Sequence, residues 1–562
     1  MLNSRTEAGS SLRFGVMCNG TVFQRWQTDA INDLARHGHQ LVLLVVDARS
    51  TPETSRFRSL LKKKWSTFLF SFLENRVFKP DARRLCTLNI GTEGVKTLHC
   101  LVEQKGFSEY FTGADVDFIR NCKVDFILRF GFNIIRGDIL TAARFGVWSF
   151  HHDDELKYRG GPAGFWEIFN RDPVNGAIMQ QLTNKLDGGI ILKKGYLKTV
   201  CHSYRGNLEQ LLTVSSAWPA MVADKLARNR GADFPESKTV APVFKVPGNW
   251  NMILFLGKLL LNRLRFYRDD FFCSEVWNVG MVSKPIHEIA LGTGTLQKGD
   301  VTWLRGAGRD KYLADPSGFI ENNQLHILAE EYNYKTGIAG ISEITPVTGP
   351  LPVIDSVYHL SYPFVIELNG ETYCLPESYQ SHAITLFKRN AENGKFTPEK
   401  ILIADVEAVD PTLFFYNGLW WLFFTVKQYS TTHLFIYYSD QLAGDYQPHA
   451  GNPVKIDVRS ARPAGTPFIH NGRLYRPAQD CSVTYGGRVE VNEVLKLSSS
   501  EFDELPVGFV MPVAGSKYNK GLHTVSGVGG HTLIDGKYYR FNRHFFVRQL
   551  QSKLKIKGPG NV

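Results

Sequence analysis

The second half of the chain contains one short pattern five times, and this repeat constrains the fold more than any other feature. Each copy is an apolar run, two residues that include Asn or Asp, and a second apolar run. Asn-Gly and Asp-Gly accept the positive φ angles of two-residue hairpin turns, so each copy predicts a β-hairpin. The predicted turns are Asn322-Asn323, Asn369-Gly370, Asn417-Gly418, Asn471-Gly472 and Asp535-Gly536. Strand repeats that recur roughly every 40–60 residues, as these turns do, are typical of propellers. We therefore expect a five-bladed β-propeller over residues 271–555.

The first half shows a different pattern, in which short apolar strands alternate with segments of helical spacing. Gln40–Val46 is nearly unbroken in apolar residues, as in strands that are buried on both faces of a parallel sheet. This alternation predicts an α/β domain over residues 12–225 with a doubly wound parallel sheet. We therefore expect a multidomain chain, because 562 residues are more than a single hydrophobic core supports. The other predicted parts are a polar tail at 1–11, a linker with an amphipathic basic helix at 226–270, and a tail at 556–562.

Composition limits the partners and the location. The net charge of +11 permits an anionic partner such as a sugar nucleotide or a phospholipid surface. The eight cysteines are scattered without a C-x-x-C pair, which argues against a zinc site and a disulfide framework and favours a reducing cytoplasm. The first eleven residues lack the apolar core of a signal peptide, and no apolar run reaches the length of a membrane span. We expect a cytoplasmic protein, with peripheral contact at the inner face of the membrane as an option.

Two segments, Leu60–Val77 and Trp250–Tyr267, combine apolar residues at helical spacing with Lys and Arg. The simpler interpretation is a helix that buries one face in the protein. The alternative is a helix that lies in a membrane interface, with its cations at anionic headgroups.

A series of motifs in residues 145–195 resembles the folate-dependent formyltransferase family. His151 falls on the family's histidine, Tyr158 to Pro162 on its Arg-Gly-x-x-Pro turn, and Leu186 to Gly189 on its Leu-Asp-x-Gly loop. Two positions depart from the family pattern: Ser149 replaces an asparagine, and His152-Asp153 replaces Pro-Ser. His152, Asp153 and Asp154 are expected in a solvated loop.

This resemblance implies roles for individual residues. His151 would be the general base, Asp187 its orienting carboxylate, and Ser149 a donor to the oxyanion. The resemblance also implies folate contacts at Arg129, Phe130, Gly131 and Gly188, and a substrate contact at Arg159. The alternative for His151 and Asp187 is a buried pair without turnover.

The repeated half resembles the propellers of furanosidase-type glycoside hydrolases, and more closely the N-terminal domain of plant glucosamine inositolphosphorylceramide transferases. The likeness is carried by Ala314-Asp315-Pro316, Ser361-Tyr362-Pro363, Val409-Asp410-Pro411 and Arg462-Pro463-Ala464. The innermost strand of each blade would point its first residues at a central axis. The candidate substrate-binding residues are Asp315, Glu331, Glu377, Asp410, Arg462, Asp480 and His523.

The sequence leaves several points of this site open. Which of Glu330 and Glu331 faces inward is undecided. The carboxylates suit sugar hydroxyls, or they perform glycosidic chemistry with Asp315 as base and Glu377 or Asp480 as acid. Alternatively, Asp-Pro and Arg-Pro simply cap strand starts.

The leading hypothesis is formyl transfer from 10-formyltetrahydrofolate to an amino sugar, nucleotide- or lipid-linked, in surface polysaccharide or glycolipid biosynthesis. The propeller would bind the glycan. No metal is expected, and the expected partner is a sugar nucleotide or glycolipid rather than a nucleic acid. Two alternatives remain: the propeller catalyses glycosyl transfer or hydrolysis beside a degenerate first domain, or the chain binds carbohydrate without turnover.

Overall fold

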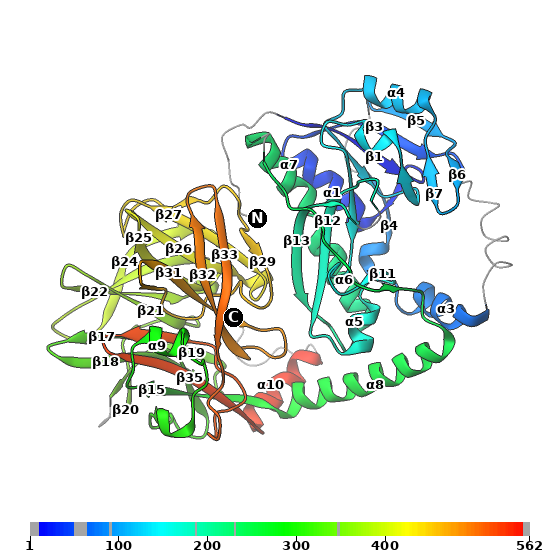
Figure 1. Cartoon of the computed structure of the whole chain (residues 1–562). Coiled ribbons are helices and arrows are strands. Elements are labelled where there is room, and N and C mark those ends of the chain that lie inside the picture. The colour runs from blue at the N-terminus through cyan, green and yellow to red at the C-terminus, as the bar shows by residue number, and fades with distance from the viewer. Residues whose placement is uncertain are drawn as a thin grey trace. The chain divides into compact units, whose positions relative to one another are not determined.

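The computed structural model describes residues 11–49, 65–88, 93–185, 188–229, 232–345 and 349–554. They form two compact units that divide between Arg263 and Leu264, inside helix α8 (Asn249–Phe272) (Figure 1). The N-terminal unit is an α/β structure, and the C-terminal unit consists almost entirely of β-sheets. The expectation of a multidomain chain with these two classes is confirmed.

The N-terminal unit is built on a seven-stranded sheet in the order β13-β12-β10-β8-β1-β3-β5. Its parallel strands are β1 (Arg13–Cys18), β3 (Gln40–Asp47), β5 (Lys96–Cys100), β8 (Phe126–Arg129) and β10 (Val147–His151). At one edge β12 (Val174–Gln181) and β13 (Ile190–Lys198) run antiparallel, so the sheet is mixed rather than wholly parallel. The loop between these two strands is too short for the helical crossover that a parallel pair needs.

Helices and short strands complete this unit. The helices before α8 are α1 (Arg25–Arg36), α3 (Phe68–Arg76), α4 (Gly113–Asn121), α5 (Phe165–Asn170), α6 (Tyr204–Ser215) and α7 (Trp218–Arg228). The short strands are β2 (Val22–Gln24), β4 (Leu85–Thr87), β6 (Glu103–Lys105), β7 (Ser108–Tyr110), β9 (Ile134–Arg136), β11 (Arg159–Gly160) and β14 (Val243–Phe244). α1 shows why such segments fold as helices, because Ala30, Ile31 and Leu34 recur at helical spacing and form its buried face.

The C-terminal unit contains five antiparallel sheets (Figure 1). Four of them use consecutive strands: β17 (Lys311–Glu321) to β20 (Gly349–Pro352), β21 (Ser361–Leu368) to β24 (Phe396–Ala404), β25 (Ala408–Tyr416) to β29 (Lys455–Ile456), and β30 (Phe468–His470) to β33 (Phe502–Val510). The intervening strands are β18 (Gln324–Asn333), β19 (Ile338–Thr345), β22 (Glu371–Glu377), β23 (Ala383–Arg389), β26 (Leu419–Val426), β27 (His433–Ser439), β28 (Gln447–Pro448), β31 (Arg473–Asp480) and β32 (Arg488–Leu497).

The remaining sheet joins both ends of the unit. It combines β15 (Ser274–Val282) and β16 (Thr302–Trp303) with β34 (Val525–Val528) and β35 (His531–Arg540). In the sequence, α9 (Ile286–Ala290) lies between β15 and β16, and α10 (Arg543–Lys553) follows β35.

Four of the five predicted hairpin turns are confirmed. Asn322-Asn323, Asn369-Gly370, Asn417-Gly418 and Asn471-Gly472 each link the first two strands of a sheet. Each of these asparagines has a positive φ, as the turn type requires. The fifth prediction is wrong: Asp535 and Gly536 lie inside β35, and the turn before that strand is at Gly529-Gly530. Asp535 is therefore a buried residue of β35 and not part of a turn.

The motif that precedes each of three turns forms a β-bulge. The strand register shifts between Ala314 and Ser317, between Ser361 and Phe364, and between Val409 and Thr412. The residue before proline at these bulges, Asp315, Tyr362 or Asp410, has φ between 44° and 50°. Such a conformation is costly for a residue other than glycine, and strained backbone of this kind clusters at functional sites.

Candidate functional site

The second strand of each hairpin places a buried polar side chain at the same position. The seventh residue of β18, β22, β26 and β31 is Glu330, Glu377, Thr425 and Gln479, respectively. All four are buried, as is Asp535 in β35. Buried polar groups need hydrogen-bond partners, and these side chains lie next to the bulged residues of the first strands.

One group of these side chains surrounds Asp410. The Arg462 guanidinium donates from Nε and Nη2 to the two carboxylate oxygens of Asp410, at 2.6 and 3.1 Å. Gln479 Nε2 also donates to Asp410, at 2.7 Å. The backbone N–H of Asp410 donates to Glu377 Oε2 at 3.1 Å, because the bulge turns this amide toward the neighbouring sheet. A charge-assisted, two-point pair therefore fixes the Asp410 carboxylate.

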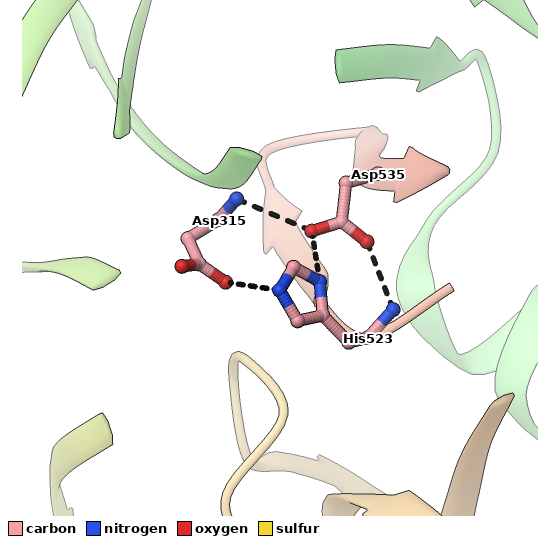
Figure 2. A group of neighbouring side chains, drawn as sticks. All are labelled: Asp315, His523 and Asp535. Carbon is pink, nitrogen blue, oxygen red and sulfur yellow. Dashed lines mark hydrogen bonds and ion pairs between the residues drawn. The ribbon is translucent and has the colours of Figure 1, made fainter. Parts of the chain in front are cut away.

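The second group is centred on His523 (Figure 2). Its imidazole lies between two carboxylates, with Nδ1 2.5 Å from Asp535 Oδ2 and Nε2 3.4 Å from Asp315 Oδ1. The backbone N–H of Asp315 donates to Asp535 at 3.2 Å, as the N–H of Asp410 does to Glu377. The Thr524 hydroxyl donates to Asp315 at 2.7 Å. We call the five acids Asp315, Glu330, Glu377, Asp410 and Asp535, with Arg462 and His523, the carboxylate cluster.

Burial and mutual repulsion hold some of these acids in the protonated form. Burial, followed by the charge of Asp410, raises the pKa of Glu377 to about 8. Burial, followed by the charges of Asp315 and Glu377, raises the pKa of Glu330 well above its usual range. Burial opposes the charged form of His523, yet Asp535 and Asp315 raise the pKa of the ring. The cluster thus holds neutral and ionised groups side by side.

Half-buried tyrosines border the cluster. The Tyr485 ring lies 5.4 Å from the His523 ring, and the Arg462 guanidinium lies 5.1 Å from its centroid. Tyr312 stacks on Tyr332 with centroids 4.8 Å apart. Aromatic faces beside carboxylates are a chemical setting that suits a sugar, which offers hydroxyl groups and apolar ring faces.

Among the described residues, Asp315, His523 and Asp535 bring ligand atoms within 4.8 Å of one another, close enough for a cation. However, each nitrogen of the imidazole already faces a carboxylate oxygen. A protonated ring therefore offsets one of the two carboxylate charges without a metal, and the expectation of a metal-free site stays a prediction.

Five of the seven substrate-binding residues predicted in the repeated half meet in this cluster: Asp315, Glu377, Asp410, Arg462 and His523. Glu331 does not, because its side chain pairs with Lys311 at 2.6 Å and accepts from Ser342 at 2.9 Å. Asp480 is bound by Ser482 and Arg488 instead. Their neighbours Glu330 and Gln479 occupy the equivalent inward positions, since adjacent strand residues point to opposite faces. Asp535 is not among the predicted site residues, because Asp535-Gly536 resembles a hairpin turn. The seventh residue of β35 is Lys537, so the position shared by the other four side chains does not point to Asp535 either.

The charge of Asp535 gives a testable prediction. Asp535→Asn is expected to lower the pKa of the His523 ring by about one unit or more, because the nearest opposing charge is removed. The measurement is NMR titration of the imidazole signals. The matched control is Asp480→Asn, whose carboxylate bonds to Ser482 and Arg488. An equal response of the ring to both variants would contradict the assignment.

In the N-terminal unit, the groups expected to hold a folate and an oxyanion are already engaged within the protein. Arg129 donates from Nη2 to the hydroxyl of Ser149 at 2.8 Å. The backbone N–H groups of Phe130 and Gly131 both donate to the Met17 carbonyl at 2.9 Å. A Cβ on Gly131 would lie 2.6 Å from the Asn19 side chain, so this close approach of strands requires glycine.

The remaining predicted residues of this unit are not brought to one described site. His151 Nε2 lies 3.2 Å from the Tyr158 carbonyl, and Arg159 pairs with β14 through its backbone. The Gly188 carbonyl accepts from Thr183. Asp187 lies outside the described residues, so its predicted pairing with His151 stays a prediction.

The segment after His151 differs from expectation. Asp153 and Asp154 are buried rather than solvated, and His152 stacks on Phe150. Asp153 accepts from the Gly164 N–H at 2.8 Å and faces the buried Glu167. Burial raises the pKa of Asp153 to about 6, and burial with the Asp153 charge raises that of Glu167 well above its usual range. The turn places these carboxyls under the sheet, where water cannot solvate them.

This acid pair should make the N-terminal unit sensitive to alkaline pH. Both folded-state pKa values are raised, so the native state holds more protons, and the free energy of unfolding should fall by about 1–3 kcal/mol between pH 5 and 8. Glu167→Gln is expected to reduce this slope, as measured by denaturant unfolding at several pH values. The exposed Asp117→Asn is the control, and an unchanged slope in Glu167→Gln would contradict the prediction.

The repeated sheets, the bulged aspartates and the buried acids define a buried carboxylate site in the C-terminal unit. Comparison with known proteins gives a family match over the same part of the chain. Residues 304–540 match the family described as glucosamine inositolphosphorylceramide transferase 1, N-terminal.

Two relatives carry the same name. Glucosamine inositolphosphorylceramide transferase 1 of Oryza sativa subsp. japonica is 30% identical over 313 residues, which cover 53% of this chain and 40% of the relative. The protein of that name from Arabidopsis thaliana is 31% identical over 255 residues, which cover 43% of this chain and 31% of the relative. The chain thus spans less than half the length of these relatives.

Solved structures give only partial matches. Glycinamide ribonucleotide transformylase 1 from Symbiobacterium toebii has 16% identity and a TM-score of 0.27, over 39% of this chain and 89% of that chain. Zg3597, a family 117 glycoside hydrolase of Zobellia galactanivorans, has 11% identity and a TM-score of 0.31, over 47% of this chain and 91% of that chain.

These relatives correct the leading hypothesis about function. Their names refer to a glucosamine inositolphosphorylceramide transferase and not to formyl transfer. The hypothesis of a formyltransferase that uses 10-formyltetrahydrofolate is therefore wrong. The backbone amides of Phe130 and Gly131, which already donate to the Met17 carbonyl, are a physical reason. The relatives favour the alternative that assigns the chemistry to the repeated half.

Proposed function

We propose that the five sheets are the blades of a five-bladed propeller and that the carboxylate cluster is its glycosyl-transfer site. Residues of the cluster come from strands β17, β18, β22, β25 and β35, which belong to four different sheets. Sheets that surround one axis bring such residues together. The sheet that joins both ends of the unit would close the ring.

The observation that carries the proposal is the pairing of a protonated Glu377 with a fixed Asp410. Glycosyl transfer needs an acid for the leaving oxygen and a base for the acceptor hydroxyl. Glu377, with its pKa raised to about 8, would be the acid, and Asp315 the base. The bond from the sugar C1 to the leaving oxygen breaks as the bond to the acceptor oxygen forms. The acceptor proton passes to Asp315, and Glu377 protonates the leaving group.

The names of the relatives suggest the substrate class. We infer that the chain transfers an amino sugar, carried by a sugar nucleotide, to an inositol-phosphate sphingolipid. The tyrosines beside the cluster would stack on the sugar ring, and the cluster carboxylates would accept hydrogen bonds from its hydroxyls.

The direct test is incubation of the full chain with UDP- and dTDP-linked amino sugars and inositolphosphorylceramide. The expected product is a lipid whose mass has gained one amino-sugar unit, and Asp315→Asn should abolish it. Thermal stabilisation by sugars without any such product would instead support the alternative of a carbohydrate-binding protein without turnover. No product and no stabilisation would overturn the proposal.

A further inference from the structure

The start of α8 carries apolar residues on both of its faces. Met252 and Phe255 are fully buried in the N-terminal unit, where Phe255 stacks on Phe165 with centroids 4.2 Å apart. Trp250, Leu254 and Leu261 lie on the opposite side of the helix and are exposed, Trp250 to 70%. A surface helix normally turns polar residues outward. We therefore expect this outer apolar face to be an interaction surface.

A second exposed aromatic row lies on and just before α3. Trp65 is 83% exposed, its ring lies 6.0 Å from Phe68, and Phe68 lies 6.1 Å from Phe72. Asn249, the first residue of α8, ties the two helices together. Its side chain accepts from the N–H of Leu69 at 3.0 Å and donates to the carbonyl of Trp65 at 2.6 Å. The exposed rings of α3 and α8 therefore belong to one body.

A basic hollow follows α3 in the same unit. It has a volume of about 440 Å³, and Lys79, Arg84 and Arg205 line it together with Asp81. Asp81 pairs with Arg25 at 2.5 Å and with Arg84 at 3.5 Å, and Arg25 also pairs with Glu209 at 2.8 Å. With Lys79 and Arg205, cations still outnumber these two carboxylates around the hollow. Phe78 packs on Tyr204 and on Phe255 of α8, which places Lys79 and Arg205 next to residues of the same core. The hollow offers positive charge of the kind that a phosphate ester requires.

We propose that α3, the start of α8 and the basic hollow dock the N-terminal unit on an anionic lipid surface. Tryptophan and phenylalanine favour the boundary between headgroups and acyl chains. Cations near an anionic leaflet are attracted by its negative surface potential. No helix among the described residues is long and apolar enough to cross a bilayer, so docking would be peripheral. The choice of lipid over a protein partner rests in part on the proposed function, which requires access to a lipid acceptor.

The test uses the full chain with vesicles of phosphatidylcholine, alone and with phosphatidylserine, in co-sedimentation. The wild type is expected to bind the anionic vesicles more tightly. Trp250→Glu with Leu261→Glu should weaken binding at least tenfold, because charges replace inserted side chains. Arg84→Glu with Arg205→Glu should weaken binding to anionic vesicles by a similar factor and leave binding to neutral vesicles unchanged.

Two control variants change the same residue types elsewhere on this unit. Phe107→Glu alters an 88% exposed ring outside the docking surface, and Arg120→Glu with Arg144→Glu reverses exposed cations. Both should bind as the wild type does. A measurement that needs no disruptive variant is quenching of tryptophan fluorescence by brominated lipid, which should decrease in Trp250→Phe.

Equal binding by all variants, or an absence of vesicle binding and quenching, would overturn the proposal. So would a dimer in analytical ultracentrifugation that Trp250→Glu with Leu261→Glu dissociates without vesicle binding, since the surface would then be a contact between two copies. Vesicle binding is measured without sugars, and glycosyl transfer is measured on detergent-dispersed lipid. The two proposals can therefore fail independently.

Discussion

Arg462→Met is expected to lower the free energy of unfolding of the C-terminal unit by about 3–5 kcal/mol. The guanidinium makes two hydrogen bonds to the buried carboxylate of Asp410 and lies 3.9 Å from Glu377. Methionine fills a similar volume but removes the cationic partner of the buried Asp410 carboxylate, which then keeps only neutral partners such as Gln479 and Glu377. Denaturant unfolding followed by tryptophan fluorescence measures the loss.

The control for this prediction is Arg473→Met, whose ion pair with Glu493 is largely exposed. Exposed pairs contribute little, so the loss should stay below about 1 kcal/mol. Adding Asp410→Asn to Arg462→Met should recover part of the stability, because the unpaired charge is removed. Equal losses in the two single variants would show that the Asp410–Arg462 pair does not differ from a surface pair.

Glu377→Gln is expected to lower the rate of the proposed glycosyl transfer by about 10²–10⁴-fold, the usual contribution of a general acid. Glutamine keeps the shape of the side chain and the acceptor for the Asp410 amide but has no acidic proton. Because the pKa of Glu377 is raised to about 8, the wild-type rate should fall as the pH increases above that value. Product mass and a pH–rate profile are the readouts.

Glu331→Gln is the matched control, since that residue lies on β18, the second strand of its hairpin as β22 is for Glu377, but pairs with Lys311 outside the cluster. It should retain the wild-type rate and pH profile. If Glu377→Gln stays active while its unfolding temperature is unchanged, the acid must be a different residue.

The hairpins and the two classes of structure could be predicted from the sequence because they depend on local chemistry. Two-residue hairpin turns require positive φ whatever surrounds them, and three Asn-Gly turns and one Asn-Asn turn stand where they were expected. Asp535-Gly536 shows the limit of this argument. The same type of dipeptide lies within β35, because strand pairing with β15 and the contacts of the buried carboxylate outweigh its turn preference.

The site was predicted to the right strands but not always to the right residue. A shift of one residue turns a strand side chain to the opposite face, so Glu331 and Asp480 were named where Glu330 and Gln479 lie inside. Register with the bulged first strands decides this, and the bulges themselves come from strained residues before proline. In the N-terminal unit, the order of the motifs suggested formyl transfer. The structure shows instead that the backbone amides of Phe130 and Gly131 bind the Met17 carbonyl.

The sequence alone determined that hairpins repeat in the second half, that an α/β pattern precedes them, and that acids, an arginine and a histidine recur close to these hairpins. These features follow from backbone preferences and from the pattern of apolar residues, which act over a few positions. Only the tertiary structure decided that His523 lies between Asp315 and Asp535, and that Arg462 and Gln479 share Asp410. Together with the bond from the Asp315 N–H to Asp535, which joins residues 220 positions apart, those contacts depend on packing between sheets.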